Sequence, residues 1–180
     1  MTSPRGEVPY DGRMSDAPRL EFDPIERAGE IWSRHIGDPT AMRLATSIMR
    51  VQQLISAELD AVLKPFGITF ARYEVLVLLS FSSTGQLPLS KIGERLMVHP
   101  TSVTNAMDRL QSQGLVRRVA DQTDRRRTFA ELTDDGQAVL DKATAAIMAI
   151  DFAVPGLSAE QQDQTYELLR TIRGAAGDFA

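Results

Sequence analysis

The chain of 180 residues contains no cysteine and only two histidines, His35 and His99. Without thiols it has no disulfide, no thiolate metal site and no thiol-based peroxide sensor. The two histidines lack the spacing of metal ligands, and the sequence holds no Ser/His/Asp or Cys/His arrangement and no phosphate loop with its glycines and lysine. We therefore expect a protein that is not an enzyme and that carries no cofactor and no metal ion.

Long hydrophobic runs are also missing. Hydrophobic residues make up 43% of the chain, yet no apolar stretch approaches the roughly 18 residues that cross a bilayer. Residues 1–22 are rich in Pro, Gly, Asp and Arg and have neither the apolar core of a signal peptide nor the pattern of a transit peptide. We expect a disordered arm over 1–22 and a cytoplasmic protein without a membrane partner.

Positive charge is scarce overall, because the formal net charge is −4, but it is unevenly distributed. Residues 89–133 carry eight basic and five acidic side chains, whereas residues 134–180 carry three basic and eight acidic ones. Charges separated by more than about 8 to 10 Å are largely screened at physiological salt, so a local basic surface can still attract phosphate. The acidity of the whole chain therefore does not exclude a nucleic acid partner.

Apolar residues recur at helical spacing along most of the chain, which predicts a mainly α protein. Asp23-Pro24 can cap and begin a short added N-terminal helix within residues 23–38. A long helix should then run to about Leu63, and Thr69 can cap a third helix that is buried nearly all round. Two more helices are expected near the C-terminus, the first capped by Thr133 and the last by a capping box of Ser158 and Gln161.

Shorter elements lie between these helices. Residues 85–88 predict a loop, Ser90 can cap a short helix, and Pro100 suits the first position of a second helix that Gly114 stops. Two strands joined by a polar, charged loop follow. Helix, tight turn, helix and hairpin is the order of a winged helix-turn-helix, which we place over residues 69–133 as the DNA-binding region.

The helix that begins at Pro100 has two different faces. At 100° per residue, Val103, Met107 and Leu110 share one apolar face, while small polar side chains lie roughly opposite. Taken alone this pattern also fits an ordinary surface helix, but the neighbouring helix and hairpin favour insertion into the major groove. The predicted DNA-binding residues of these two helices are Ser90, Thr101, Ser102, Thr104, Asn105 and Arg109.

The hairpin of residues 115–120 and 128–133 has a basic tip, with Arg125, Arg126 and Arg127 adjacent in the sequence. An arginine on a protruding loop can enter the narrow minor groove while its neighbours hold phosphates, and Asp124 can orient one of them. A run of basic residues is more commonly a solvated surface. The position directly after a helix-turn-helix favours DNA contacts from Asp124, Arg125, Arg126 and Arg127.

Several short motifs in this region belong together: Leu96-Met97-Val98, Val103-Thr104-Asn105, Asp108-Arg109-Leu110, Gly114-Leu115-Val116-Arg117-Arg118, Asp124-Arg125-Arg126, and Leu132-Thr133 with Gly136. With them, about residues 40–175 resemble the MarR family of bacterial regulators. The resemblance implies a ligand-responsive transcriptional regulator, expected to repress, whose helices at 40–64 and 134–175 form a dimerisation region. It also implies a homodimer that reads a pseudo-palindromic duplex site, with Arg126 in the minor groove and Asp124 bracing it.

A narrower resemblance is to the urate-responsive branch of that family, which adds an N-terminal helix with a Trp and binds its ligand with an acidic residue and two arginines. Trp32 matches the Trp, Glu74 stands at the acidic position and Arg118 matches one arginine, whereas Ala106 replaces the other. The resemblance implies a small aromatic or anionic effector at Trp32, Glu74 and Arg118. Two alternatives remain: Trp32 only docks the added helix, and Glu74 with Arg118 forms a structural ion pair.

A winged helix that binds only protein is the main rival to a DNA-binding one. Such a module needs neither the arginine tip nor the polar face of the helix from Pro100. Neutralising Arg125 and Arg126 separates the two hypotheses, because only DNA binding predicts a weaker and less salt-sensitive complex.

Overall fold

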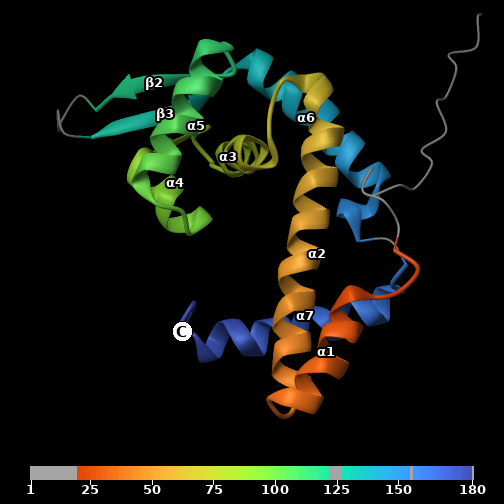
Figure 1. Ribbon diagram of the computed structural model, residues 1–180. Coiled ribbons are helices and arrows are strands. Elements are labelled where there is room, and N and C mark those ends of the chain that lie inside the picture. The colour runs from red at the N-terminus through yellow and green to blue at the C-terminus, as the bar shows by residue number, and fades with distance from the viewer. Residues whose placement is uncertain (1–19, 122–126, 155, 180) are drawn as a thin grey trace, which may run out of the picture.

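The computed structural model describes residues 20–121, 127–154 and 156–179 (Figure 1). Most of the predicted arm, residues 1–19, lies outside this described part. The elements are α1 (Pro24–His35), α2 (Thr40–Leu63), η1 (Lys64–Phe66), α3 (Phe70–Ser80), β1 (Gln86–Pro88), α4 (Leu89–Leu96), α5 (Pro100–Ser112), β2 (Val116–Ala120), β3 (Thr128–Leu132), α6 (Asp134–Ala149), η2 (Asp151–Ala153) and α7 (Ala159–Ala175). The protein is mainly α with a winged helix-turn-helix, as predicted.

The long helix α2 connects two different regions. Figure 1 shows α1 at the N-terminal end of α2, whereas α3, α4, α5 and the small sheet gather near its C-terminal end. The helix has 24 residues and is therefore about 36 Å long at 1.5 Å per residue. Within the described ranges, none of the helices is both long and apolar enough to cross a membrane.

Several helices begin where local capping chemistry predicts. The Asp23 carboxylate accepts a hydrogen bond of 2.8 Å from the backbone N–H of Ile25 at the start of α1. Thr133 caps α6, and Ser158 forms the predicted capping box at the start of α7. These side chains satisfy N–H groups that the first turn of a helix leaves without a partner.

Two predicted caps are wrong. Thr69 precedes α3, but its hydroxyl makes no capping hydrogen bond; the Asp60 carboxylate instead accepts from the N–H of Phe70 at 2.7 Å. Ser90 lies inside α4, because the helix begins one residue earlier, after Pro88. Neither start is set by the nearest hydroxyl: Asp60 of α2 caps α3, and α4 begins directly after Pro88.

The segment predicted as a loop at 85–88 contains a strand. β1 pairs antiparallel with β3, so that Leu87 lies opposite Ala130, and the sheet has the order β1-β3-β2. Leu87 and Ala130 are both buried. β1 forms because burial of Leu87 and pairing with a distant strand outweigh the turn-forming glycine and proline around it.

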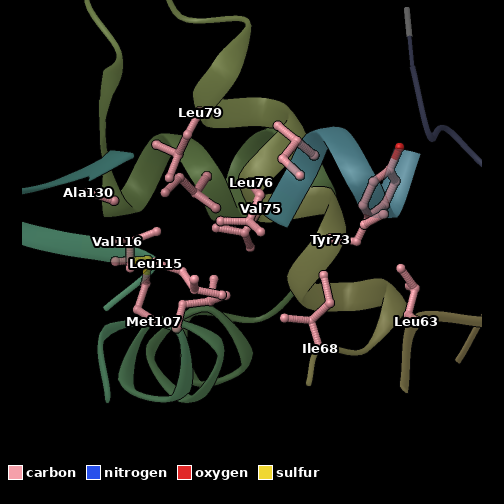
Figure 2. Packing of buried hydrophobic residues seen from close by; sticks show 14 of the residues in the cluster. Leu63, Ile68, Tyr73, Val75, Leu76, Leu79, Met107, Leu115, Val116 and Ala130 are labelled. Carbon is pink, nitrogen blue, oxygen red and sulfur yellow. The ribbon is translucent and has the colours of Figure 1, made fainter. Parts of the chain in front are cut away.

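The core lies between α3, α5, the sheet and α6. Leu76 and Leu79 of α3 and Met107 and Leu110 of α5 are fully buried, as is Ile147 of α6. Figure 2 shows Val75 and Leu76 of α3 on the side that faces Met107 and Val116, whereas Tyr73 of the same helix extends toward α6. Burial of each such side chain contributes roughly 1.5 to 3 kcal/mol to the free energy of folding. Because buried residues of α3 and α5 share this core, their packing holds α5 in position.

Two backbone features mark the start and the end of α6. At its start, a Cβ on Gly136 would collide with the carbonyl oxygen of Leu115 and with the Leu132 side chain, so only glycine allows this approach to the sheet. At its end, Asp151, Phe152 and Ala153 have positive φ angles of 48°, 52° and 57°. α6 therefore ends at Ala149, and a left-handed turn changes the chain direction before α7.

Candidate nucleic-acid interface

The turn between α4 and α5 is built by three successive local features. Met97 ends α4 in the left-handed conformation, with φ of 55°. His99 is the N-cap of α5, where its Nδ1 accepts a hydrogen bond of 3.2 Å from the backbone N–H of Thr101. Pro100 then occupies the first helical position, whose N–H has no helical partner in any case. The tight turn fixes α5 against α4, as a helix-turn-helix requires.

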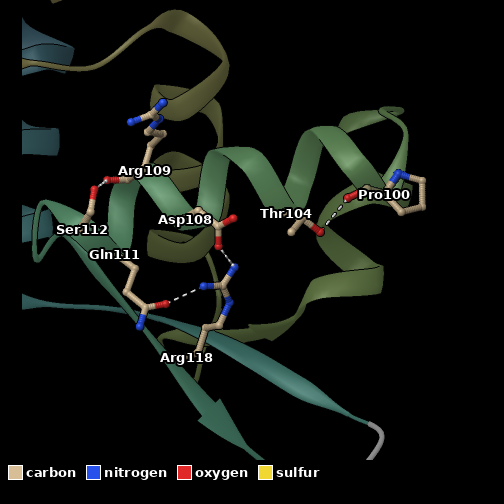
Figure 3. A network of polar contacts seen from close by, with 7 residues as sticks. All are labelled: Pro100, Thr104, Asp108, Arg109, Gln111, Ser112 and Arg118. Atoms are coloured by element: carbon tan, nitrogen blue, oxygen red, sulfur yellow. Dashed lines mark hydrogen bonds and ion pairs between the residues drawn. The ribbon is translucent and has the colours of Figure 1, made fainter.

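The two faces of α5 are arranged as predicted. Val103, Met107 and Leu110 are its buried residues. The predicted contact residues Thr101, Ser102, Thr104, Asn105 and Arg109 are all exposed. The Thr104 hydroxyl donates to the carbonyl oxygen of Pro100 at 3.1 Å and keeps its lone pairs available as acceptors (Figure 3). Short polar side chains on the open face of a supported helix suit contacts with base edges and phosphates.

Ser90, on α4, is exposed and lines a groove between α4 and α5 together with Thr104. The other side of that groove includes Met97 and Val98, which are exposed apolar residues of the turn. Ser90 therefore shares a surface with the first turns of α5. In a helix-turn-helix that binds DNA, the first helix crosses the DNA backbone while the second lies in the major groove, and Ser90 has the position on α4 that such a contact needs.

Arg118 ties the recognition helix α5 to β2. Its guanidinium donates to the Asp108 carboxylate and to the Gln111 side-chain oxygen, each at 2.6 Å (Figure 3). The predicted ion pair of Glu74 with Arg118 is wrong: among the described residues, the acidic partner of Arg118 is Asp108. Sequence spacing could not reveal this pair, because it depends on how β2 lies against α5.

The three predicted ligand residues are not brought together in one protomer. Trp32 lies on α1, which packs on the N-terminal part of α2, where Gly29 contacts Arg43. Glu74 lies on α3, which starts beside Asp60 near the other end of α2. Seventeen residues of helix between these two contacts correspond to about 25 Å. Glu74 is partly buried, and desolvation raises the pKa of its carboxyl group.

The base of the hairpin is held by a second ion pair. Arg117 of β2 contacts Glu131 of β3 through two hydrogen bonds of 2.7 and 2.8 Å, and the two residues are directly paired in the sheet. The hydrogen bond lowers the pKa of Glu131 and raises the pKa of Arg117. This contact joins two side chains that the register of β2 and β3 places opposite each other.

Of the predicted tip residues, the described part of the chain includes Arg127. Its guanidinium is 3.7 Å from the Asp121 carboxylate and 5.5 Å from the centre of the Phe129 ring. Asp124, Arg125 and Arg126 lie outside the described residues. Within the described ranges, no cluster of three or more His, Cys, Asp or Glu residues could hold a metal ion.

A polar groove of about 730 Å³ lies between the start of α3 and the flank of α5. Ser102, Asn105 and Arg109 line it from α5, and Thr69 and Arg72 line it from α3. Arg72 was not among the predicted contact residues. The available signal was a lone basic residue in the mostly apolar helix of residues 70–80, and the sequence pattern alone does not show which surface that residue joins.

Comparisons with known proteins show which family has this arrangement of helices and strands. The profile of the MarR family matches residues 68–128, which include α3, α4, α5 and β2 and end at the first residue of β3. Among curated relatives, the HTH-type transcriptional regulator YhbI of Bacillus subtilis is 34% identical over 124 residues, covering 68% of this chain and 76% of that protein.

Solved structures of similar fold belong to the same family. Sco5413, a MarR family transcriptional regulator of Streptomyces coelicolor, is 52% identical with a TM-score of 0.72, over 78% of this chain and 98% of that one. Sco3205 of the same organism, solved in complex with DNA, is 27% identical with a TM-score of 0.67, over 73% of this chain and 85% of that one. These relatives are transcriptional regulators rather than enzymes. The chain belongs to the MarR family of DNA-binding transcriptional regulators.

Proposed function

We propose that this protein is a homodimeric, ligand-responsive repressor that acts in the cytoplasm on a pseudo-palindromic duplex site. The single observation that carries the proposal is the exposed polar face of α5, supported from behind by Val103, Met107 and Leu110. The proposed DNA contacts of the helices are Ser90, Thr101, Ser102, Thr104, Asn105 and Arg109, and those of the wing tip are Asp124, Arg125, Arg126 and Arg127. The DNA complex of Sco3205, a structural relative, supports this assignment.

The apolar surface of α7 supports the homodimer. None of the α7 residues, all of which are described, is buried, although Tyr166, Leu168, Leu169 and Ile172 are large and hydrophobic. On α2, Leu44 and Met49 are similarly exposed. Such helices gain stability when a second apolar surface covers them. We assign residues 40–64 and 134–175 to the dimerisation region, with a second copy of the chain as the partner.

The effector proposal rests on the resemblance to the urate-responsive branch and names Trp32, Glu74 and Arg118 as ligand-binding residues. In the structure, Arg118 is engaged with Asp108 of the recognition helix. A small aromatic acid that bound Arg118 would therefore compete with Asp108 for the guanidinium. Loss of the Asp108 contact would loosen α5 from β2, which is a physical route from ligand binding to weaker DNA binding.

Fluorescence anisotropy with the intergenic DNA beside the protein's own gene tests the proposal. Binding is measured from 50 to about 300 mM salt, with and without urate and a panel of aromatic acids. Salt-dependent binding to one site, released by one of these compounds, supports a ligand-responsive repressor. Specific binding that no compound alters refutes the effector part. Absence of specific binding, both here and in a selected oligonucleotide pool, favours a protein-interaction module.

Two controls sharpen this experiment. Sedimentation equilibrium on the same samples reports whether the binding species is a dimer. The double substitution Arg125→Gln with Arg126→Gln reports the wing, because fewer phosphate contacts lower both the affinity and its salt dependence. A variant with unchanged binding and salt dependence contradicts the role of the tip.

A further inference from the structure

The polar groove between α3 and α5 holds two guanidinium groups, Arg72 and Arg109, neither of which has a carboxylate partner among the described residues. We propose that this groove is a phosphate site, in which Arg72 and Arg109 together bind one backbone phosphate of the DNA beside the major groove. The inference rests on the proposed function and extends it to α3, a helix outside the helix-turn-helix itself.

Arg72 is held in place by the turn that precedes α3. Its Nη1 donates to the carbonyl oxygen of Gly67 at 3.2 Å, and the side-chain Nε2 of Gln113 donates to the same oxygen at 2.7 Å. Gly67 has a φ of 71°, which glycine adopts without strain. Because Gln113 is the residue at the end of α5, this one carbonyl oxygen connects Arg72 to the recognition helix. One edge of the partly buried guanidinium is thereby fixed, while its other N–H groups remain to bind a ligand.

Arg109 approaches the groove from the other wall. Figure 3 shows its guanidinium extending from α5 in the direction opposite to the Asp108–Arg118 contact. Asp108 also lines the groove, but its Oδ1 accepts from Arg118 at 2.6 Å, so its negative charge is offset there. Two arginines and the nearby donors of Thr69, Ser102 and Asn105 then face a groove with an excess of positive charge.

The chemistry of these groups selects a phosphate. Guanidinium groups bind phosphate oxygens through two parallel N–H···O hydrogen bonds, and hydroxyl and amide groups complete such sites. The N-terminus of α3 is not used as a phosphate donor in this proposal, because Asp60 already accepts from the N–H of Phe70. When α5 lies in the major groove, side chains on its flank face the sugar-phosphate backbone, which makes DNA the natural source of the phosphate.

The experiment compares the wild-type protein with Arg72→Gln, Arg72→Lys and Arg109→Gln in anisotropy titrations over a salt series. Arg27→Gln on α1 is the matched control, because it removes the same charge from an exposed helix at the far end of α2. We expect Arg72→Gln and Arg109→Gln each to weaken binding roughly ten-fold, the loss of a hydrogen bond to a charged group. Each should also reduce the slope of log K against log salt, by at most about 0.9 for the one phosphate that the two arginines share in each half-site.

Arg72→Lys should retain most of the salt slope, because its ammonium group still neutralises the phosphate. A purely structural role of Arg72 predicts a different pattern: a lower melting temperature with an unchanged salt slope. That pattern overturns the proposal, as does an equal loss of binding in Arg27→Gln.

A neutral methylphosphonate scan of the binding site provides the second measurement. One linkage in each half-site should weaken binding of the wild-type protein when neutralised, but have little further effect on Arg72→Gln. A wild-type protein that binds its site with no such linkage refutes the phosphate site and leaves the proposed function intact. A wild-type protein that binds no DNA specifically refutes both.

Discussion

The two ends of α2 differ in how completely a single chain buries its apolar residues. At the C-terminal end, α3 to β3 enclose a core in which Leu76, Leu79 and Met107 are fully buried. At the N-terminal end, α1 packs on α2 but leaves Ile31 and Leu44 exposed, and α7 buries none of its own residues. The difference shows that α3 to β3 bury their apolar residues within one chain, whereas α1, α2 and α7 leave large apolar residues uncovered.

The largest effect is expected from Leu76→Ala in the closed core. Leu76 has no exposed surface, so truncation leaves a cavity and should cost about 2 to 5 kcal/mol in the free energy of unfolding. The loss should be the same at all protein concentrations, because the core belongs to one chain. Urea denaturation at two protein concentrations measures it, and a cost below 1 kcal/mol would contradict the central position of α3.

Gly136→Ala tests the junction between the two regions. The new Cβ would meet the carbonyl oxygen of Leu115, which is backbone and cannot rotate away. Overpacking of this kind typically costs about 1 to 3 kcal/mol, and it should also displace α6 from the sheet. Thermal unfolding measures the cost. Ala138→Gly, at an exposed position of α6, is the comparison for helix propensity alone. Helix propensity alone makes Gly136→Ala stabilising and Ala138→Gly destabilising, so a Gly136→Ala variant at least as stable as the wild type would argue against the close approach.

Leu168→Ala on α7 is the matched counterpart of Leu76→Ala. Leu168 is 69% exposed in one protomer, so truncation should hardly alter the stability of the chain itself. If a second copy covers α7, the variant should weaken dimerisation by about 1 to 2 kcal/mol per protomer, the value of the buried leucine side chain. Sedimentation equilibrium measures this change. An unaltered dimer would place the partner surface elsewhere.

The smallest expected effect is that of Glu74→Gln. Burial raises the pKa of Glu74, so the folded protein favours the protonated carboxyl and is penalised once that group ionises. Stability from this residue is therefore lost as the pH rises through its ordinary pKa toward its raised value. Glu74→Gln should be more stable than the wild type at neutral pH. The difference should vanish below about pH 4, where both side chains are neutral in both states. Unfolding curves at pH 7 and pH 3.5 test it.

Local chemistry explains which features could be predicted from the sequence. Asp23, Pro100, Gly114 and the Ser158–Gln161 capping box act on residues within one turn of themselves, and the helices begin and end where they indicate. The faces of α5 follow from its helical period in the same way. Each of these features depends on neighbours in the sequence and not on the rest of the fold.

The features that were missed depend on residues far apart in the sequence. β1 forms by pairing with a strand more than 40 residues later, and Asp60 replaces Thr69 as the cap of α3 across the turn between two helices. The partner of Arg118 is set by the packing of β2 on α5, and the position of Arg72 in a groove by the way α3 lies beside α5. No periodicity or motif within a short window contains that information.

The left-handed turn of Asp151–Ala153 sets the direction in which α7 leaves α6. α7 has 17 residues and is therefore about 25 Å long, so a rotation of about 10° at this turn would move its far end by about 4 Å. In the proposed dimer, α7 carries the contact between copies, while the spacing of the two α5 helices must match one turn of DNA, about 34 Å. In that proposed dimer, the three positive φ angles of this turn would help to set the distance between the two α5 helices.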